Sequence, residues 1–310
     1  MTTTATAPTT APVQQEFLRP FPALTSAERY HFEVFGYVIV PGVFTRDECG
    51  RMYDALQRLR RDLRAANPRD TMKSRLIGNA RFAVDKPHHV YVVSMFEYDE
   101  SLRNYACHPR CVGMAEEIMG CEARITETDA HVNSRDPEAD LSKPPVFPFH
   151  HGVDIPFGSH IGPNNLYHCN FIKTLTNLTD LGPDDGGTMV IAGSHKLTHL
   201  PVDEIIAATG ADRRLIHSVV APAGSTLLFF ESTIHSAGII QSGRDRLLII
   251  GGYTPALFQA HEGYDPEPGL IDRVPSEVRP LLNGSNRYKN WLSDRRTRTL
   301  SQPAEELSRA

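Results

Sequence analysis

The sequence predicts a mainly β protein with peripheral helices, folded as an antiparallel barrel or sandwich. Helical patterns gather in the first part of the chain, whereas short runs rich in Val, Ile, Leu, Phe and Tyr recur from about residue 80 onward. Gly, Pro, Asn and Asp separate these runs, as expected of turns between antiparallel strands. Strands and helices do not alternate along the chain, and this order disfavours a doubly wound parallel sheet.

The beginning of the chain predicts a tail followed by a helix end, a turn and a strand. Residues 1–15 are rich in Thr, Ala and Pro and carry little apolar surface, so we expect a disordered tail. In residues 30–44, the apolar run YHFEVFGYVIVPGVF is interrupted at Gly36 and ends at Pro41-Gly42. The pattern places the turn at Gly36 and a short strand after it.

An amphipathic helix should follow this strand. Thr45 and Glu48 have the spacing of a capping box, and the chain breaks at Asn67-Pro68. Further helical material is expected around residues 102–119 and in 198–209. Between the cap and the break, apolar residues recur at helical spacing: Cys49, Met52, Leu56, Leu59 and Leu63.

Six strands should form the β core. Little strand pattern follows them, and we expect residues 295–310 to be frayed. All-β units of this length often stay single, so we expect one domain over residues 16–294. The predicted strands lie in the runs VYVVSMF, ARITETDAHVN, NFIKTLTNL, GTMVIAGS, STLLFFES and LLIIGGY.

Composition narrows the possible function classes. The chain has 310 residues, a net charge of -5 at pH 7 and a pI near 6.3, so we expect no nucleic-acid partner. No apolar run approaches the roughly 20 residues that span a bilayer. The beginning of the chain also lacks a signal-peptide pattern, so we expect no membrane association and a cytoplasmic protein. The five cysteines are scattered and odd in number, which predicts reduced thiols.

Polar residues that suit metal chemistry gather in three segments. PVFPFHHGVDIPFG contains His150, DDGGTMVIAGSHK follows it, and STLLFFESTIHSAGIIQSGRDRLLIIGGY contains His235 and Arg246. Non-haem iron(II) oxygenases often bind their metal through two histidines and one carboxylate, which leaves room for a co-substrate and dioxygen. His235 lies in a turn between two strands, a rigid place for a ligand. Arg246, eleven residues later, suits a carboxylate such as that of 2-oxoglutarate.

In this order, the motifs resemble those of the phytanoyl-CoA dioxygenase-like family of iron(II)- and 2-oxoglutarate-dependent oxygenases. The resemblance covers roughly residues 30–255, from FGYVIVPGVFTRDEC through FHHG and DDGGTMVIAGSHK to the segment that ends at Tyr253. It implies a double-stranded β-helix, a cupin-like jelly roll, with His150 and His235 as metal ligands.

The same resemblance implies the cofactors Fe(II), 2-oxoglutarate and dioxygen. Arg246 would bind the distal carboxylate of 2-oxoglutarate. Thr188 falls where family members place a hydroxyl near that carboxylate, and Asn133 lies on a strand that often contributes another contact.

Gly152 departs from the family pattern. Members usually carry His-x-Asp, and aligning His150 with this histidine puts Gly152 at the position of the acid. Glycine has no side chain that could coordinate iron, so a small ligand must fill this position. The same replacement is found in non-haem iron halogenases, which implies chloride as a further cofactor and chlorination of an unactivated C–H bond. The catalytic set would then be His150, Gly152 and His235.

Other interpretations stay open. One extra residue that bulges the strand would let His151 and Asp154 form a shifted pair, with Asp154 as the third ligand of a hydroxylase. Water bound at the Gly152 position would also give a hydroxylase. The non-enzyme alternative is a pseudo-oxygenase that binds a ligand without turnover.

The substrate is expected to be a small molecule. Halogenases that resemble this family include enzymes acting on nucleotides, so a nucleoside monophosphate is one candidate, with amino acids and alkaloid-like natural products as others. The sequence does not predict the oligomeric state. Basic residues that could bind a phosphate or carboxylate of the substrate precede the barrel: Lys73, Arg75, Arg81, His88 and His89.

Overall fold

The structure is a computed structural model that describes residues 21, 23–66, 79–139, 147–152, 158–163, 165–197, 200–255, 258, 269–274, 276 and 278–282. The helices in this part of the chain are α1 (Ser26–Phe35), α2 (Arg46–Ala66), α3 (Glu100–Ala106), α4 (Pro109–Met119), α5 (Val202–Ala211), α6 (Leu270–Arg273) and α7 (Arg279–Leu282). Short 3-10 helices are η1 (Met95–Glu97), η2 (Ser194–Lys196) and η3 (Arg213–Leu215). The strands are β1 (Tyr37–Val40), β2 (Arg81–Lys86), β3 (His89–Val93), β4 (Ala123–Asn133), β5 (Ser159–Ile161), β6 (Tyr167–Cys169), β7 (Ile172–Asn177), β8 (Met189–Ile191), β9 (Ile216–Ser218), β10 (Thr226–Phe230), β11 (His235–Ser236) and β12 (Arg246–Pro255).

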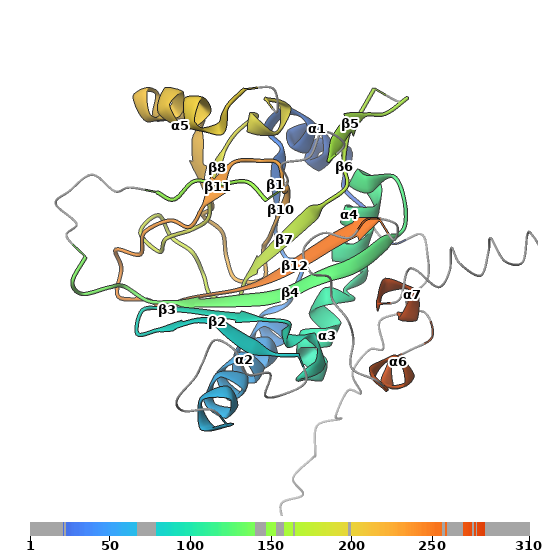
Figure 1. The fold of residues 1–310 in the computed structure, drawn as a ribbon, viewed down its shortest axis with the longest axis vertical. Coiled ribbons are helices and arrows are strands. Elements are labelled where there is room, and N and C mark those ends of the chain that lie inside the picture. Colours follow the sequence, from blue (N-terminus) through green and yellow to red (C-terminus); the bar gives the residue numbers. More distant parts are fainter. Residues whose placement is uncertain are drawn as a thin grey trace, which may run out of the picture.

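Most strands belong to one large antiparallel sheet. Its order is β1-β10-β7-β12-β4-β3-β2, and a smaller sheet has the order β11-β8-β9. Figure 1 shows β4 and β12 side by side as long strands, with α2, α3 and α4 on one side of the large sheet and β8 and β11 on the other. Two facing antiparallel sheets with helices outside form a jelly roll. The predicted fold class, mainly β with peripheral helices on a double-stranded β-helix, is confirmed.

The two faces of the large sheet have different surroundings. On the outer face, Leu247, Ile249 and Tyr253 of β12 join the large core that the helices cover. On the inner face, Leu248 and Ile250 pack with Val190 of the smaller sheet. Because side chains alternate between the faces of a strand, residues two apart on β12 share a face. Arg246 therefore belongs to the inner face, between the two sheets.

The predicted local signals are found at the start of the chain. Gly36 ends α1 in the left-handed conformation, with φ of 78°, and β1 follows. The capping box of α2 is present: the Glu48 N–H donates to Thr45 Oγ1 at 3.2 Å, and the Thr45 N–H donates to Glu48 Oε2 at 2.8 Å. The helix ends at Ala66, just before the predicted break. These features depend on neighbouring residues, and the sequence was sufficient to predict them.

One predicted element is present in two parts, and another is shorter than expected. The helical stretch at 102–119 is two helices, because Pro109 occupies the first turn of α4 and His108 caps it. The run VYVVSMF is a strand only as far as Val93. Ser94 then takes a left-handed conformation, its N–H bonds Asp129 Oδ1 at 3.0 Å, and η1 follows.

Several predictions lie outside the described residues or stay untested. The tails at 1–15 and 295–310 are outside the described ranges, and the single domain over 16–294 stays a prediction. All five cysteines are described and none forms a disulfide, as predicted. Within the described ranges, no helix has the length and apolarity to cross a membrane. The cytoplasmic location stays a prediction.

Acid is expected to destabilise the fold through His195, which is buried and stacks on Phe230 with ring centroids 5.1 Å apart. Burial, with a smaller contribution from Lys196, lowers the pKa of His195 to about 3, whereas an unfolded histidine has a pKa of about 6.5. Between these values the unfolded chain binds a proton that the folded chain does not, so the free energy of unfolding falls as pH falls.

Urea unfolding at pH 7 and pH 5 measures this contribution. His195→Gln should remove up to about 1.4 kcal/mol per pH unit of the wild-type slope below pH 6.5. The absolute stability of the variant is not the test, since any core substitution lowers it. Equal slopes in wild type and variant would show that His195 takes up its proton in the folded state.

Candidate functional site

His150 and His235 lie side by side on neighbouring backbone segments. His235 begins β11, and the His150 backbone pairs with it through two hydrogen bonds of 3.0 and 2.8 Å. The centroids of the two imidazole rings are 4.4 Å apart. Two histidines far apart in the sequence are thus held together by a backbone bridge, as two ligands of one metal ion must be.

A backbone carbonyl orients each imidazole. Nδ1 of His150 lies 3.0 Å from the Pro148 carbonyl oxygen, and Nδ1 of His235 lies 2.8 Å from that of Thr233. A carbonyl oxygen only accepts hydrogen bonds, so each Nδ1 donates and each Nε2 keeps its lone pair. Burial lowers the pKa of His235 to about 3, which keeps this ring neutral. Two imidazoles that present Nε2 are a donor set that suits ferrous iron.

Gly152 lies against the end of β10. Its N–H donates to the backbone carbonyl of Glu231 at 3.0 Å. A Cβ atom on residue 152 would lie 2.0 Å from Oε1 of Glu231 and 2.6 Å from its Cδ and Cγ. Gly152 is not among the glycines with positive φ, so the backbone does not require glycine here. The residue is small because the Glu231 side chain fills the adjoining space.

The Glu231 carboxyl is buried without a full set of partners. Only 5% of the residue is exposed, and its Oε2 has no hydrogen-bond partner in the part of the chain that the structure describes. The pKa of this carboxyl is raised to about 7, because the effect of burial, together with that of Glu127, exceeds the opposite effect of Lys173. Among the described residues, no three His, Cys, Asp or Glu side chains stand together as a metal site. As it lies, Glu231 therefore does not complete a ligand set with the two histidines.

Arg246 is a buried cation with no acidic partner in the described ranges. Only 3% of it is exposed; Nη2 donates to Thr188 Oγ1 at 2.7 Å, and Nε has no partner there. Burial alone lowers the pKa of Arg246 to about 10. A buried charge without a counter-charge is costly, so this guanidinium suits an anionic ligand.

The other predicted contact, Asn133, lies beside Arg246. The two residues are direct partners on β4 and β12, and the Asn133 Oδ1 atom is buried without a described partner. Thr188 immediately precedes β8, whose Val190 pairs with His235. The structure therefore brings the predicted anion site and the histidine pair to adjoining strands.

Sequence reasoning missed a set of buried polar residues on the inner wall. Lys173 of β7 forms an ion pair with Glu127 of β4, and both flank Gly252 of β12. Asp129 accepts a hydrogen bond of 2.6 Å from the Tyr91 hydroxyl, and burial raises the pKa of Asp129 to about 8. These residues lie on the same inner face as Arg246, because alternate residues of a strand share a face.

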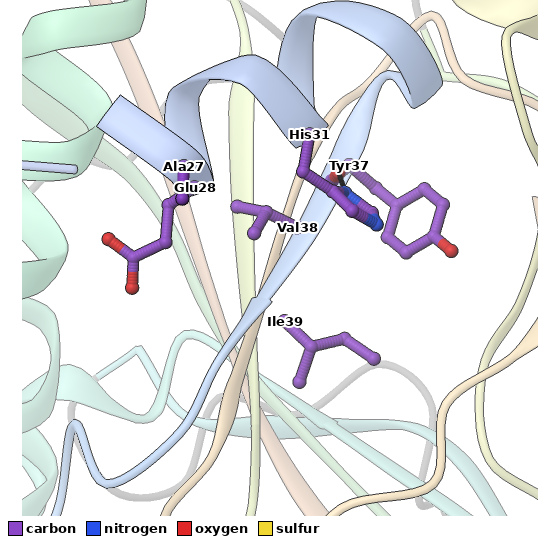
Figure 2. Close-up of a pocket in the computed structure, with 6 residues that line it drawn as sticks. All are labelled: Ala27, Glu28, His31, Tyr37, Val38 and Ile39. Carbon is purple, nitrogen blue, oxygen red and sulfur yellow. Dashed lines mark hydrogen bonds between the residues drawn. The ribbon is translucent and has the colours of Figure 1, made fainter. Parts of the chain in front are cut away.

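Two hollows on the described part of the chain lie elsewhere. One, of about 290 Å³, is lined by Ala27, Glu28 and His31 of α1 and by β1, as Figure 2 shows. The other, of about 500 Å³, includes Glu33 and residues of β5 and β6. Neither contains a predicted site residue, so the chemistry points to the histidine pair rather than to either hollow.

Two further predictions can be placed only in part. Asp154, the alternative third ligand, lies outside the described residues, as do Lys73 and Arg75. Of the remaining basic residues, His89 begins β3 as the direct partner of Asn133. His88 instead contacts Ser134 Oγ through Nδ1 at 3.0 Å.

Solved structures share this fold. HygX from Streptomyces hygroscopicus, with nickel, 2-oxoglutarate and hygromycin B bound, is 21% identical, with a TM-score of 0.60 over 79% of this chain and 92% of HygX. EctD from S. alaskensis, with bound Fe, is 18% identical, with a TM-score of 0.57 over 80% and 82%. The non-heme alpha ketoglutarate dependent epimerase SnoN from nogalamycin biosynthesis is 22% identical, with a TM-score of 0.51 over 74% and 82%.

The sequence itself shows the family. No curated protein matches it, but residues 32–248, which are well over half of the chain, match the family described as Phytanoyl-CoA dioxygenase (PhyH). The resemblance expected from the motifs is thereby confirmed. The chain belongs to the phytanoyl-CoA dioxygenase (PhyH) family and is a non-haem iron(II)- and 2-oxoglutarate-dependent oxidoreductase.

Proposed function

We propose that this enzyme is a halogenase that replaces hydrogen by chlorine at an unactivated C–H bond of a small metabolite. The observation that carries the proposal is Gly152, which stands two residues after His150 and offers no donor atom to a metal. Chloride would be the anion that enters beside Gly152. Gly152 and His150 are exposed, so a small anion can reach this side of the histidine pair.

The chain's own residues would hold the cofactors at two adjoining places. His150 and His235 would bind iron through Nε2, because their Nδ1 atoms are engaged with carbonyl oxygens. Arg246 and Thr188 would bind the distal carboxylate of 2-oxoglutarate, with Asn133 beside them. When bound, iron and 2-oxoglutarate supply the activation of dioxygen, and the protein supplies position and charge.

The overall reaction balances without a further reductant. A substrate C–H bond, chloride, a proton, 2-oxoglutarate and dioxygen give a C–Cl bond, water, succinate and carbon dioxide. The substrate carbon and 2-oxoglutarate each lose two electrons, and dioxygen accepts four. The C–H bond must be held so that chlorine and not hydroxide reaches the carbon, which is a task of substrate positioning.

The inner wall supports a polar substrate. The Glu127–Lys173 ion pair and the Asp129–Tyr91 hydrogen bond put charged and hydroxyl groups between the sheets, where a polar substrate can make further hydrogen bonds with them. His89, paired with Asn133, adds a basic group near the predicted 2-oxoglutarate contact. A nucleoside monophosphate is therefore the first substrate to test, followed by amino acids.

Hydroxylation is the second candidate function. The observation that favours it is the Glu231 carboxyl group, which lies against Gly152 and would supply the acid that this position lacks. Asp154 or water in the same position would lead to the same chemistry. Both candidates need iron bound by the two histidines, and they differ in the atom that is added.

Aerobic incubation with Fe(II), 2-oxoglutarate and a panel of metabolites, with and without chloride, tests the proposal. We expect a product with the chlorine isotope pattern in mass spectrometry only when chloride is present. Only oxygen-added product in the presence of chloride would contradict halogenation and favour the second candidate.

His235→Ala is the control for this experiment. Loss of one of two imidazole ligands should abolish succinate formation in the variant, whichever atom the wild type transfers. If the wild type forms no succinate with any metabolite and binds Fe(II) no better than the variant, the protein is a pseudo-oxygenase instead.

A further inference from the structure

Glu231 is a buried acidic group that lies against Gly152, the position of the missing ligand. It precedes His235 by four residues, at the point where β10 ends, and its backbone carbonyl accepts the N–H of Gly152. The strand alternation that turns Phe229 inward also turns Glu231 inward. Its side chain therefore points into the space between the sheets, next to the bridge that joins the two histidines.

The distances at Gly152 show how close this carboxyl group lies to the place of a family acid. The Oε1 atom of Glu231 lies 2.0 Å from the position that a Cβ atom on residue 152 would take, and its Cδ and Cγ atoms lie 2.6 Å from it. The Glu231 carboxyl therefore occupies the place where an acidic side chain on residue 152 would begin, and it comes from a different segment of the chain.

The surroundings of Glu231 leave it available to a cation. Its Oε2 is buried and has no hydrogen-bond partner within the described ranges. Lys173, the nearby cation, already pairs with Glu127. A buried carboxylate oxygen without a donor is costly, and a divalent cation beside it would offset that cost.

We propose that Glu231 is the built-in carboxylate of the metal site, which completes the ligand set with His150 and His235 when halide is absent and which chloride must displace. Because no three possible ligands already stand together among the described residues, metal binding would require the Glu231 side chain to turn toward the two histidines. The inference that chloride displaces Glu231 rests on the proposed halogenase function. The inference that Glu231 binds the metal does not.

Metal affinity in chloride-free buffer tests whether Glu231 binds the metal. Wild type, Glu231→Gln and Asp129→Asn are titrated anaerobically with Fe(II) in sulfate buffer. Glu231→Gln keeps the size of the side chain but removes its charge, and should weaken Fe(II) binding by about 10-fold or more. Asp129→Asn is the matched control: Asp129 is equally buried, but its oxygens already bond Tyr91 and Ser94, so its affinity for Fe(II) should stay that of wild type.

Restoring Fe(II) binding with chloride distinguishes a metal ligand from a residue that only supports the structure. Added chloride should restore Fe(II) binding to Glu231→Gln, because a free anion then takes the place of the carboxylate, and should change wild-type affinity much less. In the wild-type complex with Fe(II) and 2-oxoglutarate, chloride should shift the visible absorption band at higher concentrations than it does in the variant. Thermal melting of each metal-free protein checks that the variants fold.

The wild-type protein provides a test that needs no variant. If Glu231 supplies the third ligand, wild type binds Fe(II) in chloride-free buffer nearly as tightly as in chloride. A wild type that binds Fe(II) only with chloride, or a Glu231→Gln variant with wild-type affinity in sulfate, would overturn the inference. Neither result depends on which product forms, so a failure of the halogenase proposal stays distinguishable: it would appear as oxygenated product from an enzyme whose Fe(II) binding still requires Glu231.

Discussion

Arg246→Met is expected to abolish 2-oxoglutarate-dependent turnover while leaving the folded protein at least as stable as wild type. Arg246 is buried, donates to Thr188 Oγ1 and has no acidic partner in the described ranges. Removing the partner of a buried charge pair costs about 2 to 5 kcal/mol, so the variant should bind 2-oxoglutarate about 30-fold more weakly or worse. Titration of 2-oxoglutarate into the Fe(II)-loaded protein measures this loss.

The stability readout distinguishes a ligand-binding arginine from a structural one. Without 2-oxoglutarate, Arg246 is a buried charge that lacks a described counter-charge, and methionine removes this cost while filling most of the volume. We therefore expect an unchanged or higher melting temperature for Arg246→Met. Added 2-oxoglutarate should raise the melting temperature of wild type but not of the variant. A large loss of stability in the variant would mean instead that Arg246 holds the fold together through a partner outside the described residues.

Local sequence signals predicted much of the fold. The Gly36 turn and the Thr45–Glu48 capping box each depend on residues within one turn of the chain, and both are found. Alternation and apolar runs located the long strands β4 and β12 because their buried faces require such patterns. The short strands β5, β9 and β11 have two or three residues each, too few for a pattern to develop.

The sequence predicted the site residues that belong to a recognisable motif. It did not predict the residues that come together only when the chain folds. His150, His235 and Arg246 carry distinctive chemistry and stand in a characteristic order, so the sequence pointed to them. In retrospect the sequence also pointed to Glu231. Side chains alternate between the two faces along the run STLLFFES, so Glu231 faces inward like Phe229. That it lies against Gly152 depends on the pairing of residues 150–152 with the segment after β10, a contact between distant parts of the chain.

Gly152→Asp is expected to abolish chlorination, and the structure indicates that the variant will also strain the site. An aspartate would restore the family's acidic ligand, but its Cβ atom would lie 2.0 Å from Oε1 of Glu231. Glu231 must therefore turn away, and two carboxyl groups would compete for one place, which disfavours ionising both. We expect no chlorinated product, retained Fe(II) binding, and a loss of roughly 1 to 3 kcal/mol of stability from overpacking. Mass spectrometry and urea unfolding measure these outcomes.

Two further variants separate the steric effect from the chemical one. Gly152→Ala adds the same Cβ atom without a ligand, so it should lose stability as the aspartate variant does but still form chlorinated product. In Gly152→Asp combined with Glu231→Ala, the clash and the competing acid are both removed, so stability should recover and oxygen-added product should replace chlorinated product. Chlorination at the wild-type rate by Gly152→Asp would contradict the assignment of this position to chloride. Loss of chlorination in Gly152→Ala as well would mean that the position of Glu231, displaced in both variants, controls the choice between the two reactions.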